Sequence, residues 1–105
     1  MKTLLLAAAT RMELEAALAP SLESGTARRD GDAVLAGSVR LAPVATGVGL
    51  VNASRIAGAV LARGGVDGVL LAGIAGSYDP LRLPVGTAVA VSEEIWPEYG
   101  VEHPP

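Results

Sequence analysis

The sequence predicts an α/β fold with a mixed, mostly parallel central sheet and flanking helices. Two continuous apolar runs, over residues 3–9 and 66–72, are typical of strands that are buried on both faces. The segment 50–63, which precedes the second run, has the apolar period of about 3.6 residues that a helix needs. A strand ending near Thr46, this helix and the second run make a βαβ unit, for which a right-handed crossover is the rule.

Helix-start signals follow the first apolar run. Thr10 is a favoured N-cap residue, and Glu13 stands three residues later, which is the spacing of a capping box. Apolar residues on one face then predict a helix over residues 11–19. Pro20 is expected to end this helix, because proline has no backbone N–H to donate.

The region between the two predicted helices contains further strands. Residues 21–32 are polar, and Arg28-Arg29-Asp30-Gly31-Asp32 is interpreted as a turn between two strands. Strands are expected near residues 33–39 and 40–45, as a hairpin or a meander. One more strand is predicted over residues 85–91, after a loop that contains proline.

The predicted helix over 50–63 has clear boundaries. It follows the tight turn Gly47-Val48-Gly49 and ends at Gly64-Gly65, residues that tolerate positive φ. The residues expected to face the sheet are Ala53, Ile56, Ala57, Val60 and Leu61.

Composition excludes several function classes. The chain of 105 residues has the length of one domain, and 50% of its residues are hydrophobic. Its net charge of −3 argues against nucleic acid or an anionic membrane as a partner, since both need a basic surface. With no cysteine and one histidine, disulfides, thiolate metal sites and histidine clusters are excluded. We therefore expect no metal and no cofactor.

The N-terminus has some features of a signal peptide, with Lys2 followed by an apolar run. That run stops at Thr10-Arg11, which is shorter than the roughly 15–30 residues of a signal peptide. No stretch approaches the roughly 20 apolar residues that span a bilayer. A cytoplasmic protein is expected.

Three loops leave the carboxyl ends of predicted buried strands, where α/β sheets bind their ligands. These loops are Ala9-Thr10-Arg11-Met12-Glu13, Thr46-Gly47-Val48-Gly49 and Gly73-Ile74-Ala75-Gly76. Glycine lets the backbone approach a ligand closely, and a helix N-terminus supplies free N–H donors. The sequence therefore predicts a ligand site at this end of the sheet.

The second loop invites comparison with the dinucleotide fingerprint G-x-G-x-x-G. The third glycine is replaced by Asn52, and the acid that follows, Asp67, stands at the start of its strand instead of the far end. A phosphate-binding lysine of the Walker type is excluded because Lys2 is the only lysine. These departures argue against a nicotinamide or nucleoside triphosphate site.

Two roles remain open for Glu13. A Thr-x-x-Glu box needs no catalytic function, and spacing alone favours the cap. Alternatively, Glu13 is a general base at the mouth of a pocket. Trp96 and Tyr99 likewise either pack on the sheet edge or line a pocket for a ring.

As a set, the three loops resemble the nucleoside phosphorylase and nucleosidase superfamily. The resemblance extends through Val85-Gly86 to Ser92-Glu93-Glu94 and covers nearly the whole chain. Within the superfamily, the loops are most similar to those of futalosine hydrolases, which belong to menaquinone biosynthesis and release hypoxanthine from futalosine. The resemblance implies an N-glycosidic hydrolase that acts on a purine nucleoside.

The resemblance also implies roles for individual residues. Glu13 matches the carboxylate that activates the attacking water, and the expected substrate-binding residues are Thr10, Val48, Ile74, Ala75 and Gly76. Bacterial phosphorylases have Arg-x-Gly-Ser-x-Gly at the third loop, where the arginine and serine bind phosphate. This chain has Leu71 and Ile74 at those positions, which favours water as the nucleophile. Ile74 also departs from the Gly-Ser-Ala-Gly of methylthioadenosine nucleosidases.

Two family features have no counterpart in the sequence. The family binds ribose with a Met-Glu pair and protonates the purine with a Ser-Asp pair, whereas only Met12-Glu13 matches either dipeptide here. Residues 1–105 are therefore interpreted as the N-terminal part of a single nucleoside phosphorylase-like domain, from a longer chain or a decayed homologue. We expect it to be inactive alone and homo-oligomeric. The alternatives are a methylthioadenosine/adenosylhomocysteine nucleosidase and a non-catalytic nucleoside-binding or oligomerisation module.

Overall fold

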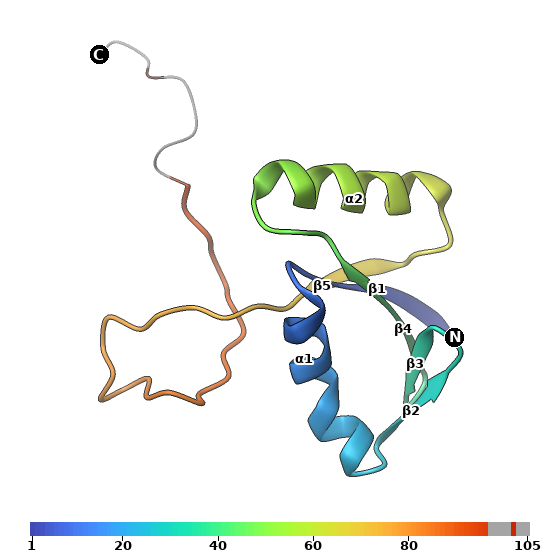
Figure 1. Ribbon diagram of the computed structural model, residues 1–105, viewed down its shortest axis with the longest axis horizontal. Helices are drawn as coiled ribbons and strands as arrows, with labels where there is room; N and C mark the ends of the chain where they lie inside the picture. Colours follow the sequence, from blue (N-terminus) through green and yellow to red (C-terminus); the bar gives the residue numbers. More distant parts are fainter. Residues whose placement is uncertain (97–101, 103–105) are drawn as a thin grey trace. The chain divides into compact units, whose positions relative to one another are not determined.

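The computed structural model describes residues 1–96 and 102. The chain divides into two units, Met1–Ala75 and Gly76–Pro105, which are described separately. The helices and strands belong to the first unit (Figure 1). In chain order they are β1 (Lys2–Ala8), α1 (Arg11–Glu23), β2 (Ala27–Asp30), β3 (Ala33–Ala36), β4 (Val39–Ala45), α2 (Leu50–Arg63) and β5 (Gly68–Leu71).

The strands form a mixed sheet, as predicted, and their order in it is β2-β3-β4-β1-β5. β1 pairs in parallel with both β4 and β5, whereas β2, β3 and β4 form an antiparallel meander. The register places Ala8 opposite Ala45 and Ala7 opposite Leu71. The carboxyl ends of β1, β4 and β5 therefore lie at the same edge of the sheet.

α1 covers one face of the sheet and contributes to the main core of the first unit. Leu14 and Leu18 are one helical turn apart and pack against Leu6 and Ala8 of β1 and Val34 of β3. Burial of a leucine side chain contributes about 1.5–3 kcal/mol. This packing fixes the start of α1, and with it Glu13, next to the end of β1.

α2 lies on the other side of the sheet from α1 (Figure 1). Alternation along β1 directs Leu5 and Ala7, both buried, to the face opposite Leu6 and Ala8. The predicted stripe of α2 is half-buried except for Leu61, which is exposed. The chain moves from β1 to β4, through α1, β2 and β3, toward one edge of the sheet, and from β4 through α2 to β5 toward the other edge. Right-handed connections in opposite directions place one helix on each face.

The structure corrects the predicted end of the first helix. α1 continues to Glu23, with Pro20 inside it. The backbone of Pro20 still accepts a hydrogen bond from the Ser24 N–H at 3.1 Å, and Leu22 in the extra turn packs against the core. Tertiary packing of the last turn outweighs the one helical hydrogen bond that proline cannot make.

The predicted turn at residues 28–32 is also wrong in its extent. Arg28, Arg29 and Asp30 belong to β2 and pair with β3, so that the turn is limited to Gly31-Asp32. β2 is the edge strand, and its exposed positions accept polar side chains that a central strand would not. The next turn, Gly37-Ser38, ends β3 at Ala36 instead of residue 39, and β4 begins at Val39 instead of residue 40.

The strand predicted over residues 85–91 is not formed. Val85, Val89 and Val91 are exposed, and the described residues of the second unit lie outside helices and strands. Its apolar alternation is a local pattern, but a strand also needs a neighbour to accept its backbone hydrogen bonds. Trp96 is exposed, and Tyr99 lies outside the described residues.

None of the helices in the described part of the chain is both long and apolar enough to cross a membrane. Within residues 1–96 and 102, no group of three or more acidic or histidine side chains is arranged to hold a metal ion.

The free edge of β5 presents apolar side chains. Val69, Leu70 and Leu71 are all exposed, and among the described strands β5 pairs with β1 alone. Unpaired apolar strands associate readily with other chains. We propose that the protein self-associates through this edge. Its apparent mass by sedimentation equilibrium is then expected to exceed 10.5 kDa as the concentration rises.

The variant Leu71→Lys is expected to restore the monomer, because lysine protects exposed strand edges from pairing. Leu71 is 65% exposed, so the substitution leaves the core intact. Met12→Lys is the matched control, since Met12 is 76% exposed and belongs to α1 instead of β5. A sharp monomer of the unmodified chain at high concentration would refute the proposal.

Candidate functional site

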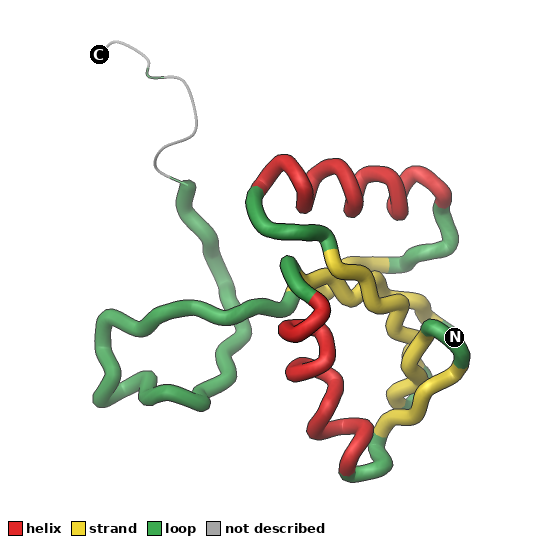
Figure 2. Tube along the Cα trace, in the orientation of Figure 1, coloured by secondary structure: helices red, strands yellow, loops and turns green. Residues whose placement is uncertain are grey.

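Three loops meet at the carboxyl ends of β1, β4 and β5, as the sequence predicted (Figure 2). Backbone hydrogen bonds fasten the second and third loops to the end of β1. The Thr46 N–H donates to the Ala8 carbonyl and the Gly47 N–H to the Ala9 carbonyl, both at 2.9 Å. Ala72, just before the third loop, donates to the Ala7 carbonyl at 2.9 Å. The edge is therefore held together by the backbone of β1.

Glu13 lies in the first turn of α1 and caps it together with Thr10. The Glu13 N–H donates to Thr10 Oγ1 at 3.2 Å, and the Thr10 hydroxyl donates to Glu13 Oε1 at 3.1 Å. Both residues are half-buried. The predicted N-cap at Thr10 is therefore confirmed, but the Glu13 carboxylate accepts from the Thr10 hydroxyl and not from the Thr10 N–H of a full capping box. The cap engages Oε1 of the carboxylate and leaves Oε2 for another partner.

Oε2 of Glu13 faces the third loop. A Cβ atom built on Gly73 would lie 3.4 Å from this oxygen, at van der Waals contact. Gly73 comes shortly after β5, and Glu13 comes shortly after β1, so their proximity follows from the parallel pairing of the two strands. The Glu13 carboxylate therefore accepts a hydrogen bond from Thr10 on Oε1, and its Oε2 lies beside Gly73.

The second loop is shaped by Thr46 and Asn52. Thr46 is buried, and its hydroxyl lies 2.9 Å from the Gly47 carbonyl and 3.3 Å from that of Ala8. The Asn52 side chain donates from Nδ2 to the Val48 carbonyl at 2.8 Å. Gly47 and Gly49 have φ of +85° and +95°, which disfavour any residue with a side chain. The loop therefore has a defined backbone conformation.

The predicted substrate-binding residues occupy different environments. Thr10 is at the helix cap, whereas Val48, Ile74 and Ala75 are exposed at the loop edge. Gly76 belongs to the second unit. Gly73, Thr46 and Asn52 were not among the predicted site residues. Asn52 stands where the dinucleotide fingerprint has its third glycine, and this difference is the feature of the sequence that could have identified Asn52 as a site residue.

Asp67 lies at the opposite end of the sheet from the loops. Its N–H donates to the Thr3 carbonyl at 2.7 Å, and its Oδ2 accepts from the Thr3 N–H at 2.8 Å. Both hydrogen bonds join Asp67, the residue just before β5, to Thr3 near the start of β1. Asp67 is therefore a structural residue there, consistent with the rejection of a dinucleotide site.

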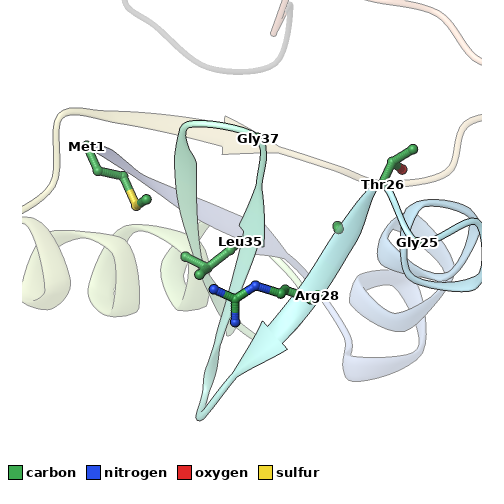
Figure 3. Close-up of a pocket in the computed structure, with 7 residues that line it drawn as sticks. Met1, Gly25, Thr26, Arg28, Leu35 and Gly37 are labelled. Atoms are coloured by element: carbon green, nitrogen blue, oxygen red, sulfur yellow. The ribbon is translucent and has the colours of Figure 1, made fainter.

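A cavity of about 220 Å³ lies near the start of β1 (Figure 3). β1 rises about 3.3 Å per residue, so its seven residues separate this cavity from the loops by roughly 20 Å. Its lining contains neither Thr10 nor Glu13. The residues that line it are Met1, Gly25, Thr26, Ala27, Arg28, Leu35 and Gly37.

Comparison with known proteins places the chain in a family. The family model of the phosphorylase superfamily matches residues 3–103, which includes all three loops. Neither a curated protein nor a solved structure matches the chain significantly. Since the family match covers nearly all of the sequence, the chain belongs to the phosphorylase superfamily, which includes nucleoside phosphorylases and nucleosidases.

Proposed function

We propose that this chain carries the water-activating side of a nucleosidase site, which hydrolyses the N-glycosidic bond of a purine nucleoside. Superfamily membership supports a nucleoside-processing function. The observation that carries the proposal is the placement of Glu13, with Thr10 on Oε1 and Gly73 beside Oε2. Because the contact with Thr10 uses Oε1, Oε2 can accept a proton from a water molecule at the loop edge.

The proposed chemistry uses Glu13 as a general base. Its carboxylate takes a proton from a water molecule while the water oxygen bonds to the anomeric carbon of the ribose. The bond from that carbon to the purine nitrogen breaks, and the purine takes up a proton from a separate acid. Positive charge develops on the sugar, and the negative carboxylate nearby stabilises it.

The third loop favours water over phosphate as the nucleophile. Leu71 and Ile74 stand where the resembling bacterial phosphorylases have an arginine and a serine, and both are exposed. A phosphate dianion needs positive charge and hydrogen-bond donors, which leucine and isoleucine side chains lack. This difference supports a hydrolase.

The resemblance to futalosine hydrolases supports futalosine as the substrate, with hypoxanthine and dehypoxanthine futalosine as products. Ile74 in place of serine separates the third loop from the Gly-Ser-Ala-Gly of methylthioadenosine nucleosidases. A cytoplasmic location and the absence of a metal or other cofactor remain predictions. Methylthioadenosine and adenosylhomocysteine are the alternative substrates.

The residues that would protonate the purine have no counterpart in the sequence, since it contains no Ser-Asp pair. We therefore expect the 105-residue chain alone to bind a purine nucleoside without measurable hydrolysis. General acid catalysis contributes about 10²–10⁴-fold, so its loss puts turnover below detection. The measurement is chromatography of the released base after incubation with futalosine or methylthioadenosine.

Binding is tested by following backbone amide signals during titration with inosine, a purine nucleoside, and with cytidine as the pyrimidine control. Inosine is expected to shift the signals of Thr10, Val48 and Gly73. Gly73→Ala is expected to weaken binding because its Cβ contacts Glu13 Oε2. Gly58→Ala is the matched control, since a Cβ at this α2 position meets nothing within 4 Å.

These results separate the candidate functions. Release of base by the 105-residue chain would show that the acid is present and that its assignment to a Ser-Asp pair is wrong. Saturable binding without hydrolysis, in this chain and in any longer chain that contains it, would favour a non-catalytic nucleoside-binding module. Absence of signal changes at all three loops would overturn the proposed site.

A further inference from the structure

We infer that Asn52 is a positioning residue, which holds the Gly47–Gly49 loop in the conformation that receives the nucleoside. The inference rests on the proposed function for the role of the loop and on the structure for the role of Asn52. Asn52 is the third residue of α2, whose N-cap, Gly49, has no side chain to satisfy the first turn. The Asn52 side chain does not cap these N–H groups but turns back to the loop and donates from Nδ2 to the Val48 carbonyl at 2.8 Å.

The contact with Gly47 makes this arrangement specific. A Cβ atom on Gly47 would lie 3.2 Å from Cγ and 3.3 Å from Nδ2 of Asn52. These distances are shorter than ordinary van der Waals contacts, so the Asn52 amide fits closely against a residue that must be glycine. The positive φ of Gly47 imposes the same requirement independently.

Asn52 completes a set of contacts that fixes the loop from two directions. On one side, the Gly47 N–H binds the Ala9 carbonyl, and the Thr46 hydroxyl lies within hydrogen-bond distance of the Gly47 carbonyl. On the other side, Asn52 binds the next carbonyl, that of Val48. Residue 48 is therefore held by α2, whereas residues 46 and 47 are held by the sheet.

The chemistry of asparagine suits this role. Its amide nitrogen donates to a carbonyl without adding charge beside the first turn of α2, and its short side chain reaches back within the same turn. A glycine, as in the dinucleotide fingerprint, would leave the Val48 carbonyl to water and the loop less ordered. Asparagine at this position therefore orders the loop in a way that glycine would not.

Two variants test the inference. Asn52→Ala removes the whole amide, and Asn52→Asp keeps its shape but replaces the donor by an acceptor that faces the Val48 carbonyl. Ser54→Ala is the matched control, because Ser54 is exposed on the same helix. The loop is followed without ligand by hydrogen exchange of the Gly47 amide, which donates to the Ala9 carbonyl, and of the Ala53 amide, which donates to the Gly49 carbonyl. Affinity is followed by titration with inosine at a temperature where all chains are folded.

Both Asn52 variants are expected to speed exchange of the loop amides and to raise the Kd for inosine by about 3- to 10-fold, the effect of one lost hydrogen bond. Ser54→Ala should change neither quantity. A purely structural role would lower the melting temperature of both variants and leave the Kd unchanged. That outcome would overturn the inference.

A different set of results is expected if the proposed function is wrong. If the unmodified chain binds no purine nucleoside, the proposed function fails. Hydrogen exchange of the loop amides then decides alone whether Asn52 positions the loop. Unchanged exchange in both variants would then refute the positioning role. Faster exchange would establish that Asn52 orders the loop, and the part of the inference that concerns the nucleoside would be overturned.

Discussion

Replacement of Glu13 by glutamine is expected to lower nucleoside hydrolysis by about 10²–10⁴-fold, the usual contribution of a general base. Glutamine keeps an oxygen that accepts from the Thr10 hydroxyl, and the backbone N–H that Thr10 caps is unchanged. The melting temperature should therefore stay close to that of the unmodified protein. The measurement is kcat with a purine nucleoside, in any chain containing these residues that turns it over.

Glu15→Gln is the matched control for this experiment. Glu15 lies two residues further along α1, and its exposed carboxylate pairs with Arg29 at 2.8 Å. Exposed ion pairs contribute little to stability, so neither kcat nor the melting temperature should change appreciably. If Glu13→Gln retained full turnover while Glu13→Ala lowered the melting temperature, Glu13 would be a helix cap and the catalytic assignment would be wrong.

Local patterns were sufficient to predict the centre of the fold. The apolar run at residues 3–9 became β1 (Lys2–Ala8), and the helical period at 50–63 matched α2 to the residue. Both segments have strong residue patterns and clear end signals. Their tertiary contacts agree with these local preferences, so the predicted elements form. The Thr10–Glu13 cap was predicted for the same reason, since it depends only on spacing within one helical turn.

Long-range packing decided the elements that the sequence did not predict. Pro20 lies inside α1 because the following turn brings Leu22 onto the core. Arg28 to Asp30 form a strand because an edge position tolerates polar residues. Residues 85–91 have a strand pattern but lie outside any strand. None of these outcomes follows from the residue pattern of the segment alone.

The candidate site, like the fold, could be predicted from the sequence only in part. Sequence identified Glu13 and the three loops, but the contact between Glu13 and Gly73 depends on the parallel pairing of β1 with β5. The Asn52 bond to Val48 is local, yet its geometry depends on the positive φ of Gly47 and Gly49. A pattern of residue types does not specify such backbone angles uniquely. Asn52 was therefore visible in the sequence only as an exception to a fingerprint.

Leu5→Ala is expected to lower the free energy of unfolding by about 2–5 kcal/mol, the usual cost of a leucine deleted from a core. Leu5 is 1% exposed and lies in β1, opposite Ala42 of β4 and Val69 of β5. Alanine would lose the buried apolar surface and leave a cavity that two neighbouring strands cannot close. Since small domains are stable by about 5–15 kcal/mol, a large share of the stability would disappear.

Urea denaturation of this variant measures the loss, with Leu81→Ala as the matched control. Leu81 is 95% exposed, so the same change of side chain there removes almost no buried surface. The control should unfold at nearly the same urea concentration as the unmodified protein, whereas Leu5→Ala should unfold at a much lower one with a similar slope. Equal, small losses in both variants would mean that Leu5 is not buried in solution. The parallel sheet that brings Glu13 to Gly73 would then also be in error, because β1 is the strand that joins its two sides.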